Sequence, residues 1–170
     1  VEYRVAEATA SGLPAVSVDL VTVAQALHWF DTPAFYAEVR RVARPGAVCA
    51  AWGYGLMRVT PAVDAVVEHF YRDVVGPYWP PERAHLDAGY RTLAFPFPEF
   101  PAPSLAMEAT WPLADLLGYL ATWSAAKRYA KTVGADPIER VGADLTRAWG
   151  PAHAPRAIAW PLYLRVGRVG

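Results

Sequence analysis

Three side chains with useful chemistry follow a strongly apolar run near the start of the sequence. In VDLVTVAQALHWFD, residues 18–31, the apolar run is followed by Gln25, His28 and Trp29. An amide, an imidazole and an indole could simply pack the end of a strand against the next helix. In an open parallel sheet, however, ligands bind at the carboxyl ends of the strands. The spacing therefore also predicts a ligand site at this position.

Other residues with chemical potential are scattered along the chain. Arg128 and Arg156 would suit a carboxylate substrate through bidentate hydrogen bonds, although arginines of this kind are usually solvated. Cys49 lies in the apolar run AVCAAW and is expected to be a small buried hydrophobe. His85 and His153 lack metal-ligand spacing with any cysteine or carboxylate cluster, so we expect no metal site.

Length and composition favour one compact core and a small partner. The chain has 170 residues, 54% of them hydrophobic, and sixteen basic residues balance sixteen acidic ones. No basic cluster indicates nucleic-acid binding, and no apolar stretch is long enough to span a bilayer. We expect a cytoplasmic protein without nucleic acid or membrane among its partners. Because the sequence begins at Val1 in what looks like a strand, we also expect a fragment.

Hydrophobic periodicity predicts an α/β fold for the first third of the chain. Residues 16–24 are a continuous apolar run typical of a strand buried on both faces of a parallel sheet. Thr32 as N-cap and Pro33 as first residue predict a helix over 33–43, and 47–52 predict the next strand. The order strand, helix, strand indicates a right-handed crossover between parallel strands.

The rest of the chain is predicted to contain strands, helices and one irregular segment. Alternation in residues 1–5 predicts a further strand, and the segment GPYWPPERAHLDAGYRTLAFPFPEFPAP predicts an ordered cover rich in proline and aromatic residues. The other expected elements are a helix from Thr60-Pro61, a strand over 104–111, a helix carrying Leu116, Leu117, Leu120 and Trp123, a helix over 136–149, and a closing strand at an edge or in an antiparallel pair over 160–166.

The first 52 residues resemble a known enzyme family. The pattern AEATASGLP, then VDLVTVAQALHWFD, then FYAEVRRVARPGAV is similar to the later motifs of class I S-adenosylmethionine-dependent methyltransferases of type 11. The segments YWPPERAHLDAGYRTLAFPF, LLGYLATWSAAKRY and WPLYLRVGRV resemble the trans-aconitate methyltransferase-like branch. The family's glycine-rich loop and its ribose-binding acidic residue have no counterpart in this chain.

The resemblance implies roles for individual residues. Glu7 would accept a hydrogen bond from the adenine amino group, and the backbone amide of Ala8 would meet a ring nitrogen. Ala24 and Gln25 would line the methionine side of the cofactor. His28 and Trp29 would stand beside the transferable methyl, with His28 as general base if the acceptor is a hydroxyl. Substrate-binding candidates are Trp29, Tyr54, Arg128 and Arg156.

The expected fold is therefore a Rossmann-like class I methyltransferase sheet lacking its first strands, with a Pro- and aromatic-rich cap and a C-terminal antiparallel strand pair. One partial domain would comprise the end of the cofactor-binding half (1–52), a helix and cap (53–104), and closing strands and helices (105–170). The expected function is methyl transfer from S-adenosylmethionine to a small-molecule acceptor, for which a carboxylate is one candidate. The alternative is a non-catalytic remnant or partner-dependent binding fragment.

The resemblance also implies an exposed sheet edge. Without the strand that carries the glycine-rich loop, the strand at 18–24 would lose a neighbour, and such an edge favours aggregation or pairing with another chain. We therefore expect the isolated chain to be poorly soluble or dimeric through that edge, and inactive by itself.

Overall fold

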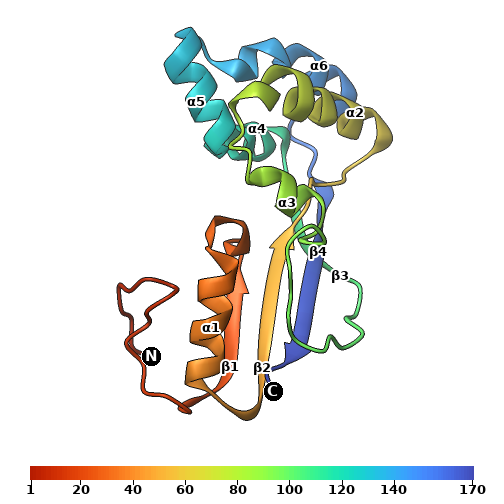
Figure 1. Ribbon diagram of the computed structural model, residues 1–170. Coiled ribbons are helices and arrows are strands. Elements are labelled where there is room, and N and C mark those ends of the chain that lie inside the picture. Colours follow the sequence, from red (N-terminus) through yellow and green to blue (C-terminus); the bar gives the residue numbers. More distant parts are fainter. The chain divides into compact units, whose positions relative to one another are not determined.

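A computed structural model describes residues 1–170, which divide into two compact units (Figure 1). The first unit comprises residues 1–55, 82–105 and 162–170, and the second comprises 56–81 and 106–161. The strands are β1 (Val18–Ala24), β2 (Ala43–Tyr54), β3 (Leu105–Trp111) and β4 (Arg156–Arg168). The α-helices are α1 (Thr32–Val42), α2 (Pro61–His69), α3 (Arg83–Asp87), α4 (Leu113–Thr122), α5 (Ser124–Val133) and α6 (Gly142–Trp149).

The four strands form one mixed sheet in the order β1-β2-β4-β3. β1 and β2 are parallel, as the sequence predicts, with Val21 opposite Cys49 and Ala24 opposite Trp52. β4 runs antiparallel to β2 and places Leu164 opposite Trp52. The expected mixed α/β sheet is thus confirmed. Of the two alternatives for the closing strand, the antiparallel pair is confirmed by β2 and β4. The edge position is wrong, because β3 lies on the other side of β4.

The helix between β1 and β2 begins one residue earlier than its sequence suggests. Asp31, rather than Thr32, is the N-cap, and its carboxylate accepts a hydrogen bond of 3.4 Å from the Ala34 amide. Pro33 still lies in the first turn, where its missing N–H costs nothing. Phe35, Val39 and Val42 are buried along one face, as their spacing predicts.

The core of the first unit lies on one face of the sheet. Val23 of β1 and Cys49 and Ala51 of β2 are buried there, together with Phe35 and Val39 of α1. Cys49 is fully buried and unpaired, and burial raises the pKa of its thiol to about 11. The expectation of a structural cysteine is confirmed, since a thiol with this pKa is a poor nucleophile at neutral pH.

Two sequence-based expectations about regular structure are wrong. Residues 1–5 are exposed and form no strand, because alternation alone cannot make one without a neighbouring strand to pair with. The helix expected over 136–149 is divided into a 3-10 turn at Pro137–Arg140 and α6, with Asp136 capping the turn through the Ile138 amide.

The second unit is mainly helical. α2 begins at the expected Thr60 cap and ends in a π-helical turn over Phe70–Val74. Large buried side chains of this unit come from α2, the π-helical turn, α4, α6 and β4: Val63, Val67, Phe70, Leu116, Leu120, Leu145, Trp149 and Ile158. None of the helices in the structure is both long and apolar enough to cross a membrane.

β1 forms an open edge of the sheet, since β2 is its only neighbouring strand. The sheet face opposite α1 carries Leu20, Val48 and Trp52, and Leu20 is 56% exposed. A polypeptide of residues 1–170 should therefore associate in solution through this edge and face.

Light scattering coupled to size-exclusion chromatography checks this expectation. Leu20→Lys should shift the population toward monomer, because a charge on an edge strand opposes pairing with another chain. A monodisperse monomer for the unaltered polypeptide at micromolar concentration would contradict it.

Candidate active site at the ends of two strands

The turn after β1 is held by the end of β2. Gln25 has a left-handed backbone, with φ of 54°, and its amide donates a 2.8 Å hydrogen bond to the Trp52 carbonyl. Its side-chain Oε1 accepts a 2.9 Å hydrogen bond from the Tyr54 amide. Two predicted site residues, Gln25 and Tyr54, are therefore brought together, and Gln25 is committed to fixing the turn.

The imidazole of His28 is buried next to this turn. Only 8% of the residue is exposed, whereas its neighbour Trp29 is 55% exposed, and the two ring centroids lie 4.7 Å apart. Burial lowers the pKa of His28, and the charges of Arg83 and His85 lower it further. Glu82 and Asp87 oppose this effect, so the charged groups around the ring all come from α3 or its N-cap.

Tyr90 also contacts His28, and no pattern in the sequence predicts this contact. Its hydroxyl lies 3.3 Å from His28 Nδ1, and the rings are stacked at 5.9 Å between centroids. Tyr90 is fully buried, and burial raises the pKa of its phenol to about 12, against the opposing effects of the Leu27 backbone and Arg83. The phenol is therefore protonated at neutral pH.

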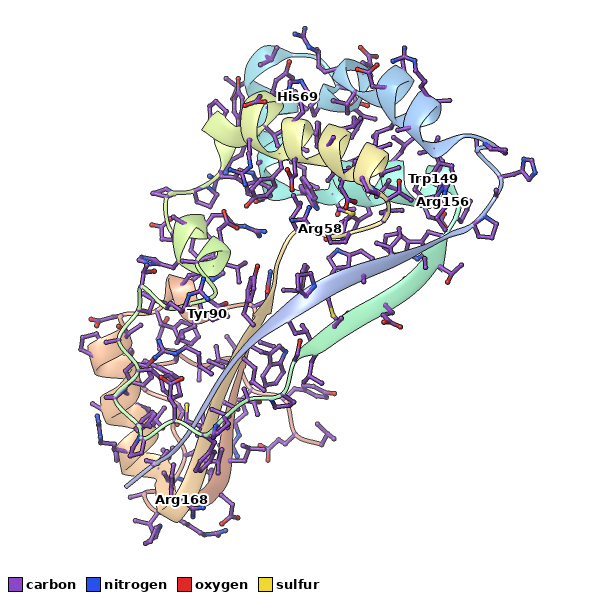
Figure 2. All side chains as sticks on the ribbon, turned by 90° about the vertical axis from the view of Figure 1, so that its right-hand side faces the viewer. Arg58, His69, Tyr90, Trp149, Arg156 and Arg168 are labelled. Atoms are coloured by element: carbon purple, nitrogen blue, oxygen red, sulfur yellow. The ribbon has the colours of Figure 1, made fainter.

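The backbone of Tyr90 is held in place by a clamp from β4. Tyr90 has φ of 60°, a conformation that costs energy for a bulky residue. The Arg165 guanidinium donates hydrogen bonds of 3.0 Å to the Tyr90 carbonyl and 2.7 Å to the Leu93 carbonyl, and it pairs with Glu99. Figure 2 marks Tyr90 on the segment that follows α3. The clamp fixes this segment against the sheet.

Backbone strain is concentrated at this site. Only three non-glycine residues have a positive φ, and two of them, Gln25 and Tyr90, border His28; the third is Val16. Such residues persist where the surrounding structure over-determines them, and they cluster at functional sites. The strain is thus an independent indication that the ends of β1 and β2 carry function.

Gly53 allows the close approach that this arrangement needs. A Cβ at position 53 would overlap the Leu86 side chain and would lie 2.9 Å from Gln25 Oε1 and 3.2 Å from the Tyr90 hydroxyl. A glycine near the end of a strand often marks such a close approach. The Gly53-Tyr54-Gly55 sequence could have revealed this position, whereas no periodic pattern marks Tyr90.

A cavity of about 420 Å³ lies beside β1, within the size range of ligand pockets. Ala8 and Ala24, both predicted to contact the cofactor, line it together with Phe30. Most of the remaining lining is apolar, which suits a flat heterocycle better than a charged group.

The loop that carries Ala8 toward this cavity is anchored on α1. The Ser11 amide and hydroxyl donate hydrogen bonds of 2.9 and 2.6 Å to Glu38, and Arg41 donates 2.7 Å bonds to the same carboxylate. Arg41 also donates a 2.8 Å bond to the Leu13 carbonyl. Hydrogen bonds from Arg41, followed by those from Ser11, lower the pKa of Glu38 from 4.5 to about 2.

Glu38→Gln should make the free energy of unfolding less dependent on pH in the acidic range. Because the folded-state pKa of Glu38 is lowered, its ionised form stabilises the fold above about pH 4.5, and this contribution is lost as the pH falls toward 2. The variant should be less stable than wild type at pH 7 and should lose less stability between pH 7 and pH 3.

Urea unfolding midpoints at the two pH values measure this difference. Glu108→Gln, at an exposed carboxylate, is the control that should leave the pH dependence unchanged. Equal pH dependence for Glu38→Gln and wild type would show that the anchor contributes nothing.

The other predicted site residues are more dispersed. Glu7 is exposed and forms a turn with Ala10, adjoining Ala8 but outside the lining of the cavity. In the second unit, Arg156 lies against Trp149 and donates two hydrogen bonds to the Trp149 carbonyl. Both residues are labelled in Figure 2. Arg128 is exposed and makes one 3.5 Å hydrogen bond, to the Tyr78 carbonyl. Of the two arginines, Arg128 is the freer to bind a carboxylate.

No three side chains of histidine, cysteine, aspartate or glutamate are grouped so that they could hold a metal ion. The Nδ1 atom of His85 lies 2.8 Å from the Thr92 hydroxyl, and His85 is one of the groups that lower the pKa of His28.

Comparisons with known proteins point to one family. Residues 1–51 match the family model described as "Methyltransferase domain". A solved structure of a "Putative Type II Methyltransferase" from Anaeromyxobacter dehalogenans is 52% identical, with a TM-score of 0.91 over 99% of this chain and 72% of that one. A "Putative methyltransferase" from Dictyostelium discoideum is 35% identical over 152 residues. This match covers 88% of the chain but only 58% of that relative.

Proposed function

Because the chain belongs to the class I S-adenosylmethionine-dependent methyltransferases, we propose that the full-length protein transfers a methyl group to a small-molecule acceptor. The observation that carries this proposal is the arrangement of Gln25, His28, Tyr54 and Tyr90 at the carboxyl ends of two parallel strands. This edge of an open sheet is where ligands bind. S-adenosylmethionine, the cofactor of the family, supplies a methyl group already activated on a sulfonium.

The residues proposed to contact that cofactor lie at or next to the cavity beside β1. Glu7 would accept a hydrogen bond from the adenine amino group, and the Ala8 backbone would meet the ring. Ala24, at the rim of the same cavity, and Gln25 would line the methionine side. The protein would then contribute to catalysis mainly by aligning the reactants and excluding water, because the methyl donor needs no covalent nucleophile.

The acceptor that we propose is a small carboxylic acid, in keeping with the resemblance to the trans-aconitate methyltransferase-like branch. A carboxylate is ionised at neutral pH and needs no base, so its main requirement is a cationic group. Of the two candidate arginines, Arg128 is the better suited to this role, since Arg156 is engaged with Trp149. In the first unit, Trp29 and Tyr54 remain the candidate substrate contacts. If the acceptor is a hydroxyl instead, His28 would have to serve as general base.

Calorimetry with S-adenosylhomocysteine tests the cofactor part of this proposal. The full-length protein should bind the ligand, and Glu7→Ala should weaken binding roughly tenfold, the cost of a lost charged hydrogen bond. Glu108→Ala, at an exposed carboxylate of the second unit, is the control and should bind as wild type does.

Unchanged affinity in Glu7→Ala would remove this residue from the site. Absence of binding to the full-length wild-type protein would instead favour the alternative, a non-catalytic or partner-dependent member of the same fold.

A further inference from the structure

The hydroxyl of Tyr90 lies 3.3 Å from His28 Nδ1 and also accepts a hydrogen bond from the Leu27 backbone. Tyr90 is 0% exposed, so water does not reach the residue. A buried phenol is almost always hydrogen-bonded, and its O–H must find an acceptor. The side-chain partner of the hydroxyl is His28 Nδ1, whereas Gln25 Oε1 is paired with the Tyr54 amide. Nδ1 of His28 is therefore the acceptor for the Tyr90 proton.

The opposite direction of this hydrogen bond is unfavourable. If His28 carried its proton on Nδ1 and donated it to Tyr90, the hydroxyl proton would be left without an acceptor in a buried site. A doubly protonated ring would have the same defect and would also add a charge to a buried group near Arg83. Both alternatives leave a polar group unsatisfied, whereas no buried side-chain nitrogen or oxygen in the structure lacks a partner.

We propose that Tyr90 is a positioning residue that holds His28 as the neutral imidazole with its proton on Nε2. In this tautomer, the ring presents a hydrogen-bond donor at Nε2 and has no lone pair there to take a proton. The Arg165 clamp keeps Tyr90 in its left-handed conformation, which aims the hydroxyl at Nδ1.

The tautomer deepens the proposed function, on which this step rests, by selecting the class of acceptor. A ring that donates from Nε2 can orient an oxygen that is already anionic, but it cannot deprotonate a hydroxyl. With a carboxylate, the oxygen forms the new O–CH₃ bond while the C–S bond breaks and its electron pair passes to sulfur. No proton is taken up or released, so this reaction needs no base.

Nitrogen NMR of the full-length protein labelled with ¹⁵N-histidine tests the tautomer without any turnover. The chain has four histidines, and the signals of His28 are those missing from His28→Gln. In the wild-type protein, Nδ1 should have the chemical shift of an unprotonated nitrogen and Nε2 that of a protonated one. In Tyr90→Phe, this single pattern should give way to a mixture of tautomers, and the titration midpoint of His28 should rise by about one pH unit.

Tyr36→Phe is the matched control. Tyr36 is also a buried tyrosine of the first unit, but its hydroxyl donates to the Ala94 carbonyl at 2.9 Å and does not touch His28. This variant should leave the His28 signals unchanged. If Tyr90→Phe does not fold, the wild-type spectrum alone decides the direction of the hydrogen bond.

A protonated Nδ1 in the wild-type protein would overturn the proposal, as would identical His28 signals in Tyr90→Phe and wild type. The failure of the proposed function has a different signature. In that case, the tautomer would be as predicted, but the full-length protein would neither bind S-adenosylhomocysteine nor transfer a methyl group.

Discussion

Replacing His28 by glutamine should leave methyl transfer within about tenfold of wild type, whereas His28→Ala should lower it about a hundredfold. The glutamine amide keeps a neutral N–H donor at the end of a side chain of similar reach, so it reproduces the donor role of Nε2. Alanine removes the donor and leaves a space beside the Trp29 and Tyr90 rings, which now contact His28. Rates measured with saturating cofactor compare the two variants.

Equal and large losses in both variants would contradict the donor role, because glutamine cannot accept a proton as a general base does. Calorimetry with S-adenosylhomocysteine is the accompanying control. Both variants should retain most of their cofactor affinity if His28 acts mainly on the acceptor. A loss of affinity that matches the loss of rate would place His28 in cofactor binding instead.

Gly53→Ala should destabilise the protein by about 1–3 kcal/mol and weaken the binding of S-adenosylhomocysteine at least tenfold. The added Cβ would overlap Leu86, which is fully buried and has little room to move, and would crowd Gln25 Oε1. Either Leu86 or the turn at Gln25 must therefore shift, and this turn precedes His28 by three residues. Thermal unfolding and calorimetry measure the two effects.

Gly118→Ala is a sharp control for this variant. Gly118 lies within α4, and a Cβ there would meet nothing within 4 Å. The substitution should raise stability by up to about 1 kcal/mol, since alanine is the better helix former. If Gly53→Ala behaved like Gly118→Ala, position 53 would not require a glycine, and the tight packing described for the site would be wrong.

The sequence predicts the elements that build the site better than the contacts within it. The apolar run of β1, the amphipathic pattern of α1 and the apolar strand β2 each satisfy a local rule, and their parallel pairing follows from the crossover. The N-cap at Asp31 was misplaced by only one residue, because both Asp31 and Thr32 can cap a helix.

Contacts that join distant segments could not be predicted in this way. Tyr90 meets His28 across 62 residues, from a segment rich in proline that has no periodicity to reveal which side chain faces inward. Its left-handed backbone depends on Arg165, which lies 75 residues further along the chain. The alternation in residues 1–5 predicts a strand that the structure does not contain. A strand needs a neighbouring strand to pair with, and a local pattern does not show whether one is present.

The most direct test of the central claim is transfer of a labelled methyl group from S-adenosylmethionine by the full-length protein to a panel of small carboxylic acids and alcohols. We predict label in the methyl ester of at least one carboxylic acid, none in an alcohol, and a rate that falls about a hundredfold in His28→Ala. Efficient methylation of an alcohol with no reaction of any acid would contradict the donor role of His28. Absence of transfer to every acceptor, together with no binding of S-adenosylhomocysteine, would contradict the assignment of methyltransferase activity itself.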